Sequence, residues 1–159
     1  MKINTRYIAQ AALIAAVYAV LTVILAPISY GPMQVRISEA LTVLPALTPA
    51  AIPGLFAGCI IANVISPYGV LDMIMGSLAT LIAAVASRKL ALAGKSALVP
   101  LPPVISNGII LATMWWILDG APWLANFFWV AFGELIACYC VGYPLMKLLE
   151  KRSDIFKLQ

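Results

Sequence analysis

Long apolar stretches dominate the chain, and short polar or turn-forming segments separate them. The first stretch covers residues 7–28 and ends at a loop signal at residues 29–32, which includes Gly31 and Pro32. A helix of about 20 largely apolar residues is long enough to cross a bilayer. This stretch is too long for the core of a signal peptide, and the chain stays hydrophobic after it. We therefore predict a retained membrane span.

The next apolar stretch, residues 34–66, is too long for one helix. Pro45, Pro49 and Pro53 interrupt it, and proline removes a backbone donor and clashes with the preceding turn. The pattern predicts a short helix over residues 35–47 and a longer one over 51–65. The alternative is that this pair is re-entrant, which leaves four full spans and the same sidedness.

Three more spans are predicted at residues 70–85, 97–118 and 123–149. A basic segment separates the first two, and a tight turn with Gly120 and Pro122 separates the last two. The expected fold is an all-α polytopic membrane protein with six transmembrane helices, the second one short. We expect residues 1–159 to form a single transmembrane domain.

The amino-acid composition also indicates that lipid, rather than water, surrounds most of the protein. The 159 residues are 64% hydrophobic and 10% charged, whereas soluble domains average roughly 45–50% apolar and about 25% charged. The mean hydropathy is +1.02. A soluble chain would have no way to bury so much apolar surface.

The placement of Lys and Arg tests the span count, because cytoplasmic loops collect these residues. Six spans with a cytoplasmic N-terminus put nine basic residues inside and only Arg36 outside. An odd count would place one basic end across the bilayer. We therefore expect both termini on the cytoplasmic side of the cell membrane. The nine residues are Lys2, Arg6, Arg88, Lys89, Lys95, Lys147, Lys151, Arg152 and Lys157.

Polar residues from several predicted helices lie at mid-membrane or further out. Ionisable groups inside a span are costly and are functional candidates by default. Carboxylates accept hydrogen bonds and amides both donate and accept, and the acids outnumber the base. The set therefore suits a cationic or donor-rich ligand, such as the edge of a nucleobase-like ring. The predicted substrate-binding residues are Arg36, Glu39, Asn63, Asp72, Asn107 and Glu134.

Structural explanations for these residues stay open at this point. Arg36 and Glu39 are three residues apart and could pair along a helix. Asn63 and Asn107 could be hydrogen-bonding contacts between helices, and Asp72 could complement a helix dipole. Glu134 is the hardest to explain structurally.

Aromatic, sulfur-containing and small residues have simpler interpretations. Trp115, Trp116 and Trp123 are typical of an outer aromatic belt, although one of them could stack on a ligand. Cys59, Cys138 and Cys140 are interpreted as buried packing thiols. Gly54 and Gly58 predict close helix packing, and the alanine pairs of the first span predict either packing or a face for another membrane subunit. These pairs are Ala11 with Ala15 and Ala12 with Ala16.

Several function classes are not expected. The chain has no His, and its Cys spacing is not that of a metal site or a disulfide framework. We expect no metal, no cofactor and no catalytic residues, so the chain is not predicted to be an enzyme. Its basic residues stand at segment ends rather than in one patch, so no nucleic-acid partner is expected.

The run from residue 34 to 45, Gln-Val-Arg-Ile-Ser-Glu-Ala-Leu-Thr-Val-Leu-Pro, resembles the QueT family of queuosine-precursor transporters. Further matching pieces cover nearly the whole chain. They are Pro53 and Gly54 through Ala62 and Asn63, Asp72 with residues 76–80, residues 101–104 with Asn107, and Gly133, Glu134 and Leu135.

The resemblance implies a substrate-binding (S) component of an energy-coupling factor (ECF) transporter. Such a subunit captures its ligand from outside and works with a membrane coupling subunit and two cytoplasmic ATPases. The implied ligand is a queuosine precursor of the 7-aminomethyl-7-deazaguanine class. Glu134 or Glu39 is expected at the ring edge and Asp72 at the amine. By the same resemblance, Ala9, Ala12 and Ala16 form the docking face for the coupling subunit. The alternative function is a stand-alone channel or proton-coupled carrier.

Overall fold

A computed structural model describes residues 5–31 and 35–152, and the regular structure within these ranges is entirely helical. This confirms the all-α fold class. The elements in chain order are α1 Thr5–Ile24, α2 Ala26–Ser29, η1 Ile37–Ala46, α3 Ala51–Ala62, η2 Asn63–Ile65, α4 Val70–Leu92, η3 Ser96–Leu98, α5 Leu101–Asp119, α6 Trp123–Leu135, η4 Ile136–Gly142 and α7 Tyr143–Glu150.

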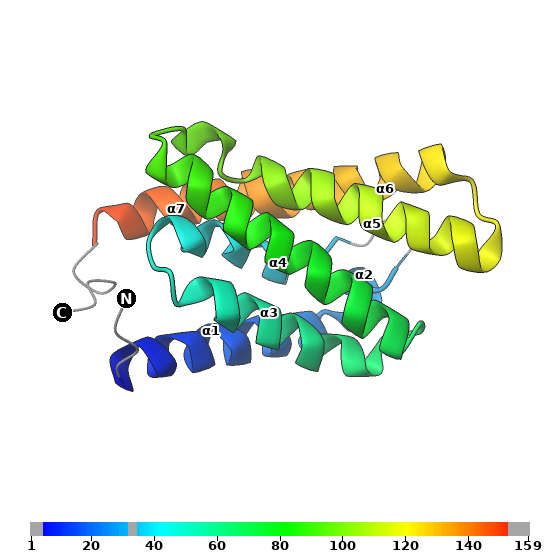
Figure 1. Ribbon diagram of the computed structural model, residues 1–159, viewed down its shortest axis with the longest axis horizontal. Helices are drawn as coiled ribbons and strands as arrows, with labels where there is room; N and C mark the ends of the chain where they lie inside the picture. The colour runs from blue at the N-terminus through cyan, green and yellow to red at the C-terminus, as the bar shows by residue number, and fades with distance from the viewer. Residues whose placement is uncertain (1–4, 32–34, 153–159) are drawn as a thin grey trace.

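The long helices lie side by side in one bundle, and successive ones run in opposite directions (Figure 1). Helix α3 packs between α1 and α4, and α5 packs between α4 and α6. Four helical segments of the described chain are long and apolar enough to cross a membrane: Thr5–Ile24, Val70–Leu92, Ser96–Asp119 and Trp123–Glu150. Two shorter apolar helices, Ile37–Ala46 and Ala51–Ile65, accompany them.

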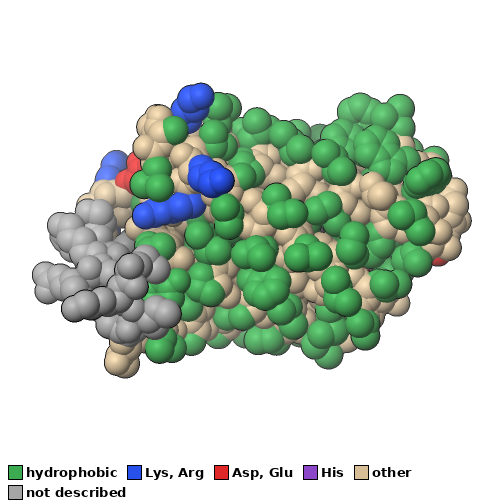
Figure 2. Space-filling model, in the orientation of Figure 1, with side chains coloured by type: hydrophobic (Ala, Val, Ile, Leu, Met, Phe, Trp, Pro, Cys, Tyr) green, Lys and Arg blue, Asp and Glu red, His purple; other side chains and the backbone are tan. Residues whose placement is uncertain are grey.

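The surface of the bundle has a polar end and an apolar middle. In Figure 2, hydrophobic side chains cover the visible face, and the Lys and Arg side chains gather at one end. Helix α1 begins and helix α7 ends at that same end (Figure 1). Large side chains such as Leu13, Ile74 and Phe128 are more than half exposed, which suits contact with lipid rather than with water.

Helices α1 and α3 approach closely because glycines of α3 face the α1 backbone. A Cβ atom added at Gly54 would meet the carbonyl oxygen of Ala11 at 2.7 Å, and one at Gly58 would meet that of Ala15 at 2.8 Å. The predicted role of Gly54 and Gly58 in internal packing is therefore confirmed. The same contact assigns the Ala11–Ala15 pair of α1 to packing.

The short helix η1 is a 3₁₀ helix of 10 residues, longer than such helices usually are. The 3₁₀ form was not predicted from the sequence. Its end is held from outside, because the Arg88 guanidinium donates to the carbonyl oxygens of Pro45 at 2.9 Å and Ala46 at 3.2 Å. These bonds satisfy carbonyl groups that a helix end leaves without intrahelical partners.

One predicted boundary is wrong, and one predicted helix has an irregular middle. Helix α4 does not end at residue 85 but continues to Leu92, since its buried face extends through Ala83, Ala84 and Ser87. Arg88 therefore lies within a helix rather than in a loop. The predicted helix over residues 123–149 is present, but its middle, Ile136–Gly142, is a π-helix. A Cβ atom at Gly142 would meet the carbonyl oxygen of Ala40 at 2.9 Å, so the π segment packs directly on η1.

Candidate functional site

Glu39 is fully buried in the first turn of η1, and nearly all of its polar atoms have partners. Its backbone N–H donates to the carbonyl oxygen of Arg36 at 3.0 Å. Its carbonyl oxygen accepts from Thr42 at 2.6 Å. The carboxylate oxygen Oε1 accepts from the Tyr18 hydroxyl and, at 3.5 Å, from Thr80. The other carboxylate oxygen, Oε2, has no partner in the described structure.

Glu134 is buried near the end of α6 and is held between α5 and the π segment. Asn107 of α5 donates to its Oε1 at 2.8 Å. The Cys138 thiol lies 3.5 Å from both Glu134 Oε2 and the Glu39 carbonyl oxygen. Cys138 therefore joins the two glutamates, which come from η1 and α6.

Arg36 is buried at the N-terminal end of η1, with only 3% of its surface exposed. The carbon at the centre of its guanidinium lies 5.3 Å from the centroid of the Tyr30 ring, a cation–π arrangement. Two of its nitrogens, Nε and Nη2, have no hydrogen-bond partner in the described chain. Guanidinium nitrogens only donate hydrogen bonds, so Nε and Nη2 can each bind an acceptor that the described chain does not provide.

Asn63 and Asp72 meet where α3 gives way to α4. The Asn63 amide donates to the Asp72 carbonyl oxygen at 3.0 Å, and Ser66 donates to Asp72 Oδ2. Gly76 of α4 leaves room for this cluster, because a Cβ atom there would lie 2.8 Å from Asn63 Nδ2 and 3.9 Å from Arg36 Nη1. Asn63 Oδ1 and Asp72 Oδ1 are buried without partners among the described residues.

The six predicted residues thus form two adjoining groups. Asn107, Glu134 and Glu39 lie on one side, and Arg36, Asn63 and Asp72 lie on the other. No ion pair within 4.0 Å joins Arg36 to a carboxylate in the described ranges, where the one salt bridge is Lys147–Glu150. The predicted Arg36–Glu39 pairing along a helix is therefore not formed as an ion pair. Buried charges are normally paired, so this arrangement suits a ligand that supplies the missing partners.

A cavity of about 510 Å³ adjoins the second group. Asp72 lines it, and Trp115 contributes a largely buried ring whose Nε1 has no partner in the described structure. Tyr68 stands 6.1 Å from Trp115, centroid to centroid, in a tilted arrangement. The remaining lining residues are Tyr30, Gly31, Pro67, Ala121, Asn126 and Trp129. The cavity is therefore an aromatic-walled space with a carboxylate at its edge.

Sequence reasoning missed several residues of this site, among them Tyr18, Thr80 and Cys138. Tyr18 was detectable, because Tyr18 and Thr22 are four residues apart on an alanine-rich helix and share its buried face. Thr80 and Cys138 carry no such signal. They are small residues in apolar helices, and only their contacts with Glu39 and Glu134 distinguish them.

The burial of two tryptophans and three cysteines differs in part from the predictions. Trp116 is 57% exposed, as expected for an aromatic belt, but Trp115 is only 8% exposed and faces the cavity. Assigning Trp115 to the belt was wrong. Cys59 and Cys138 are buried, whereas Cys140 is exposed, so the packing interpretation fails for Cys140.

Helix α1 also carries an alanine face that no other described element covers. Ala9, Ala12 and Ala16 are exposed, while Ile14, Ala15 and Tyr18 of the same helix are buried. The two faces arise because α1 packs on α3 and η1 along one side only.

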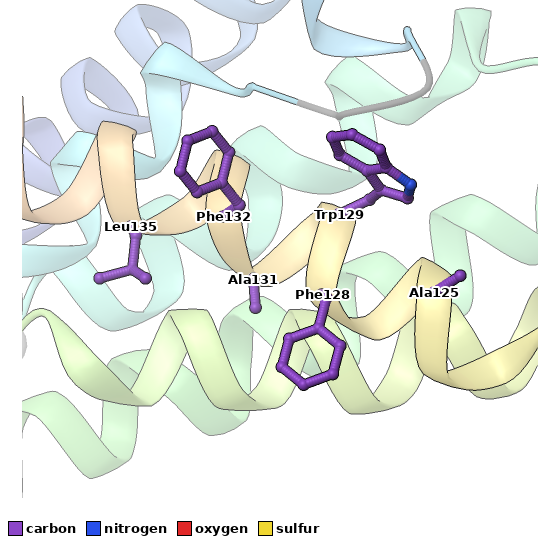
Figure 3. A pocket seen from close by; sticks show the side chains of 6 residues that line it. All are labelled: Ala125, Phe128, Trp129, Ala131, Phe132 and Leu135. Carbon is purple, nitrogen blue, oxygen red and sulfur yellow. The ribbon is translucent and has the colours of Figure 1, made fainter.

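A further hollow is apolar and lies away from these polar groups. It has a volume of about 470 Å³ and is lined by residues of α6 alone, among them Phe128, Phe132 and Leu135 (Figure 3). Phe128 is 61% exposed. This groove is a surface for lipid contact rather than a site for a polar ligand.

The comparison with protein families decides where the chain belongs. The family described as QueT transporter matches residues 8–151. The chain belongs to the QueT transporter family. The resemblance seen in residues 34–45 is thereby confirmed.

A curated relative of this family member is the queuosine precursor transporter QueT of Lactococcus lactis subsp. cremoris (strain MG1363), 39% identical over 83 residues. The match covers 51% of the chain and 48% of the relative, so it spans about half the length of that protein. No solved structure matches the chain.

Membership of a transporter family, with several apolar helices of spanning length, identifies a multi-pass membrane protein. The QueT family is one of transporters and not of enzymes.

Proposed function

We propose that this QueT family member captures a queuosine precursor of the 7-aminomethyl-7-deazaguanine class from outside the cell. It serves as the S component of an ATP-driven ECF importer in the cell membrane. The relative from Lactococcus lactis is named as a queuosine precursor transporter. The observation that carries the proposal is the set of buried polar atoms that lack partners around Arg36, Glu39, Asn63 and Asp72.

These atoms have the chemistry that such a ligand needs. A deazaguanine edge offers N–H donors and a carbonyl acceptor, and the aminomethyl group is a cation. Glu39 Oε2 accepts from the ring edge, beside Glu134, while the Arg36 nitrogens donate to an acceptor. Asp72 Oδ1 binds the ammonium group next to the aromatic walls of the cavity, where cation–π attraction adds to the ion pair.

The proposed topology has six spans with both termini in the cytoplasm. The basic end of the bundle then faces the cytoplasm, as the distribution of Lys and Arg requires. Residues 29–31, 66–69 and 120–122 then lie at the outer end, near the cavity. A ligand arriving from outside reaches Asp72 and Trp115 first and the two glutamates after that.

The proposed partners are a membrane coupling subunit and two cytoplasmic ATPases. The exposed Ala9, Ala12 and Ala16 provide a flat face for the coupling subunit, since small side chains let helix backbones approach closely in lipid. The bundle as a whole acts as one substrate-binding domain. No metal or cofactor takes part in the proposed function.

Thermal unfolding of the purified protein in detergent tests the ligand assignment. A ligand that binds only the folded state raises stability by RT ln(1 + [L]/Kd), which is about 2.7 kcal/mol at 100 times Kd. 7-Aminomethyl-7-deazaguanine should raise the midpoint temperature, and adenine should not. Equal midpoints with and without the deazaguanine would contradict the proposal.

A stand-alone proton-coupled carrier is the second candidate, and one observation favours it. Glu134 is a deeply buried carboxyl group in a chain without His, and such groups serve as proton sites in transporters. Reconstitution in vesicles separates the two functions. Uptake by this subunit alone, driven by a pH gradient without ATP, would favour the carrier over the S component.

A further inference from the structure

Tyr18 of α1 contacts the Glu39 carboxylate of η1 directly. It is completely buried in α1, and its hydroxyl donates to Glu39 Oε1. Thr80 of α4 adds a longer contact of 3.5 Å to the same oxygen. Both contacts fall on Oε1, and no described residue bonds Oε2, so within the described chain the carboxylate has one occupied oxygen and one free oxygen.

The position of Tyr18 is itself fixed by the close contact between α1 and α3. A Cβ atom placed at Gly58 would meet the Tyr18 Cβ at 3.0 Å and the Ala15 Cα at 3.0 Å. Helix α1 thus packs directly against the α3 backbone at Gly58, and this contact holds the Tyr18 Cβ in place.

A second bond ties the same face of α1 to η1. Thr22, four residues after Tyr18, bonds the Ser38 hydroxyl at 2.6 Å and the Tyr18 carbonyl oxygen at 2.9 Å. Ser38 and Glu39 are adjacent in η1, so α1 holds the first turn of η1 at two neighbouring points. The backbone of this turn and the Glu39 carboxylate are both oriented from α1.

A buried carboxylate oxygen without a hydrogen-bond partner is destabilising. Without Tyr18 the carboxylate would be free to rotate about its last torsion, which is broad for Glu, and to satisfy itself with other donors. Tyr18 prevents this by occupying Oε1, which leaves Oε2 for a ligand donor. Preorganised groups of this kind give specificity because they lose little freedom on binding.

We propose that Tyr18 is a positioning and specificity-determining residue: it holds Glu39 so that Oε2 reads a hydrogen-bond donor on the ligand ring, the exocyclic amino group of a guanine-type edge. The inference rests on the proposed function. It adds that selection between guanine-type and hypoxanthine-type rings depends on a residue of α1 that need not touch the ligand.

The test compares two ligands on two proteins by calorimetry. The ligands are 7-aminomethyl-7-deazaguanine and its counterpart without the 2-amino group, and the proteins are the wild type and Tyr18→Phe. Wild-type protein should prefer the guanine-type ligand. Tyr18→Phe should weaken binding of that ligand by about tenfold or more, the size expected for one hydrogen bond to a charged group. Binding of the 2-deamino ligand should change by less than about twofold, so the preference collapses.

Tyr139→Phe is the matched control, since the one hydrogen bond of its hydroxyl among the described residues is to the Ala97 carbonyl oxygen at 3.3 Å. It should keep the wild-type preference. If the role of Tyr18 were purely structural, Tyr18→Phe would weaken the binding of both ligands equally, and that result would overturn the inference. Unchanged affinities in Tyr18→Phe overturn it as well.

Glu39→Gln decides the case if Tyr18→Phe does not fold. The amide keeps the shape of the side chain but changes its hydrogen bonding, so the preference should collapse again, and an unchanged preference would overturn the inference. Where both single variants fold, the double variant should show no loss beyond that of Glu39→Gln, because the two residues act through one contact. Failure of the wild type to bind either ligand would instead reject the proposed function itself.

Discussion

The Asn107 amide donates to Glu134 Oε1 over 2.8 Å, and this bond joins α5 to α6 inside the bundle. The second carboxylate oxygen of Glu134 is 3.5 Å from the Cys138 thiol. Glu134 thus differs from Glu39 and Asp72, which each keep one oxygen without a partner in the described structure. A thiol is a weak donor, so a ligand N–H could replace it at Oε2. We therefore predict that Glu134 Oε2, the oxygen that Cys138 contacts, is the one that faces the ligand.

Glu134→Gln should abolish high-affinity ligand binding while the protein stays folded. The variant puts an amide in place of a charged acceptor, and one hydrogen bond to a charged group is worth about 1.5–3 kcal/mol, or roughly tenfold to a hundredfold in affinity. Calorimetry with 7-aminomethyl-7-deazaguanine measures the loss. The control is Glu150→Gln, which removes the exposed acid of the Lys147–Glu150 pair. Unchanged affinity in Glu134→Gln would remove this residue from the site.

Ala12→Leu should spare ligand binding but weaken assembly with the coupling subunit. Ala12 is exposed on α1, and a larger side chain there keeps two helix backbones apart. Size-exclusion chromatography of the co-expressed complex gives the measurement. Ala125→Leu is the matched control, because Ala125 is an exposed alanine of α6. An intact Ala12→Leu complex would show that assembly uses another face.

Gly58→Ala should destabilise the protein, although alanine favours helices by up to about 1 kcal/mol over glycine. The added Cβ would lie 2.8 Å from the Ala15 carbonyl oxygen and 3.0 Å from its Cα. These are backbone atoms, so α1 and α3 must move apart, at a typical cost of about 1–3 kcal/mol. The midpoint temperature of unfolding should fall, whereas Ala57→Ser at the half-buried neighbouring position should change it little. A higher midpoint for Gly58→Ala would mean that helix propensity outweighs the clash.

Tyr68 should titrate at unusually high pH. The hydrogen bond to Asp119, 2.8 Å long, and then partial burial raise the pKa of Tyr68 from 10.0 to about 12. Because the folded pKa is raised, the stabilising contribution of this group is complete below pH 10 and is lost as the pH rises from about 10 to about 12. Tyrosinate absorbance of wild type minus Tyr68→Phe isolates the group. Asp119→Asn should bring the midpoint back toward 10, and a wild-type midpoint already near 10 would contradict the contact.

Local sequence patterns are enough to predict the membrane class, the helical pattern and the family. Hydropathy and proline positions located the two short helices between residues 35 and 65, because lipid requires apolar side chains and proline interrupts backbone hydrogen bonding. The costly polar residues Glu39, Asp72 and Glu134 were also visible, since few charged groups occur inside spans. All three are buried in the structure.

The partners of these residues follow from the way the helices pack together, which local patterns do not predict. The 3₁₀ form of η1 and the π segment beside it occur where Ala40 packs against Gly142 and where Arg88 bonds the end of η1, contacts that no local pattern encodes. Tyr18, Thr80 and Cys138 became recognisable through contacts between residues 21 to 99 positions apart. Hydropathy reports only whether a side chain prefers lipid. Which oxygen of Glu39 stays free depends on where α1, α4 and η1 meet in space.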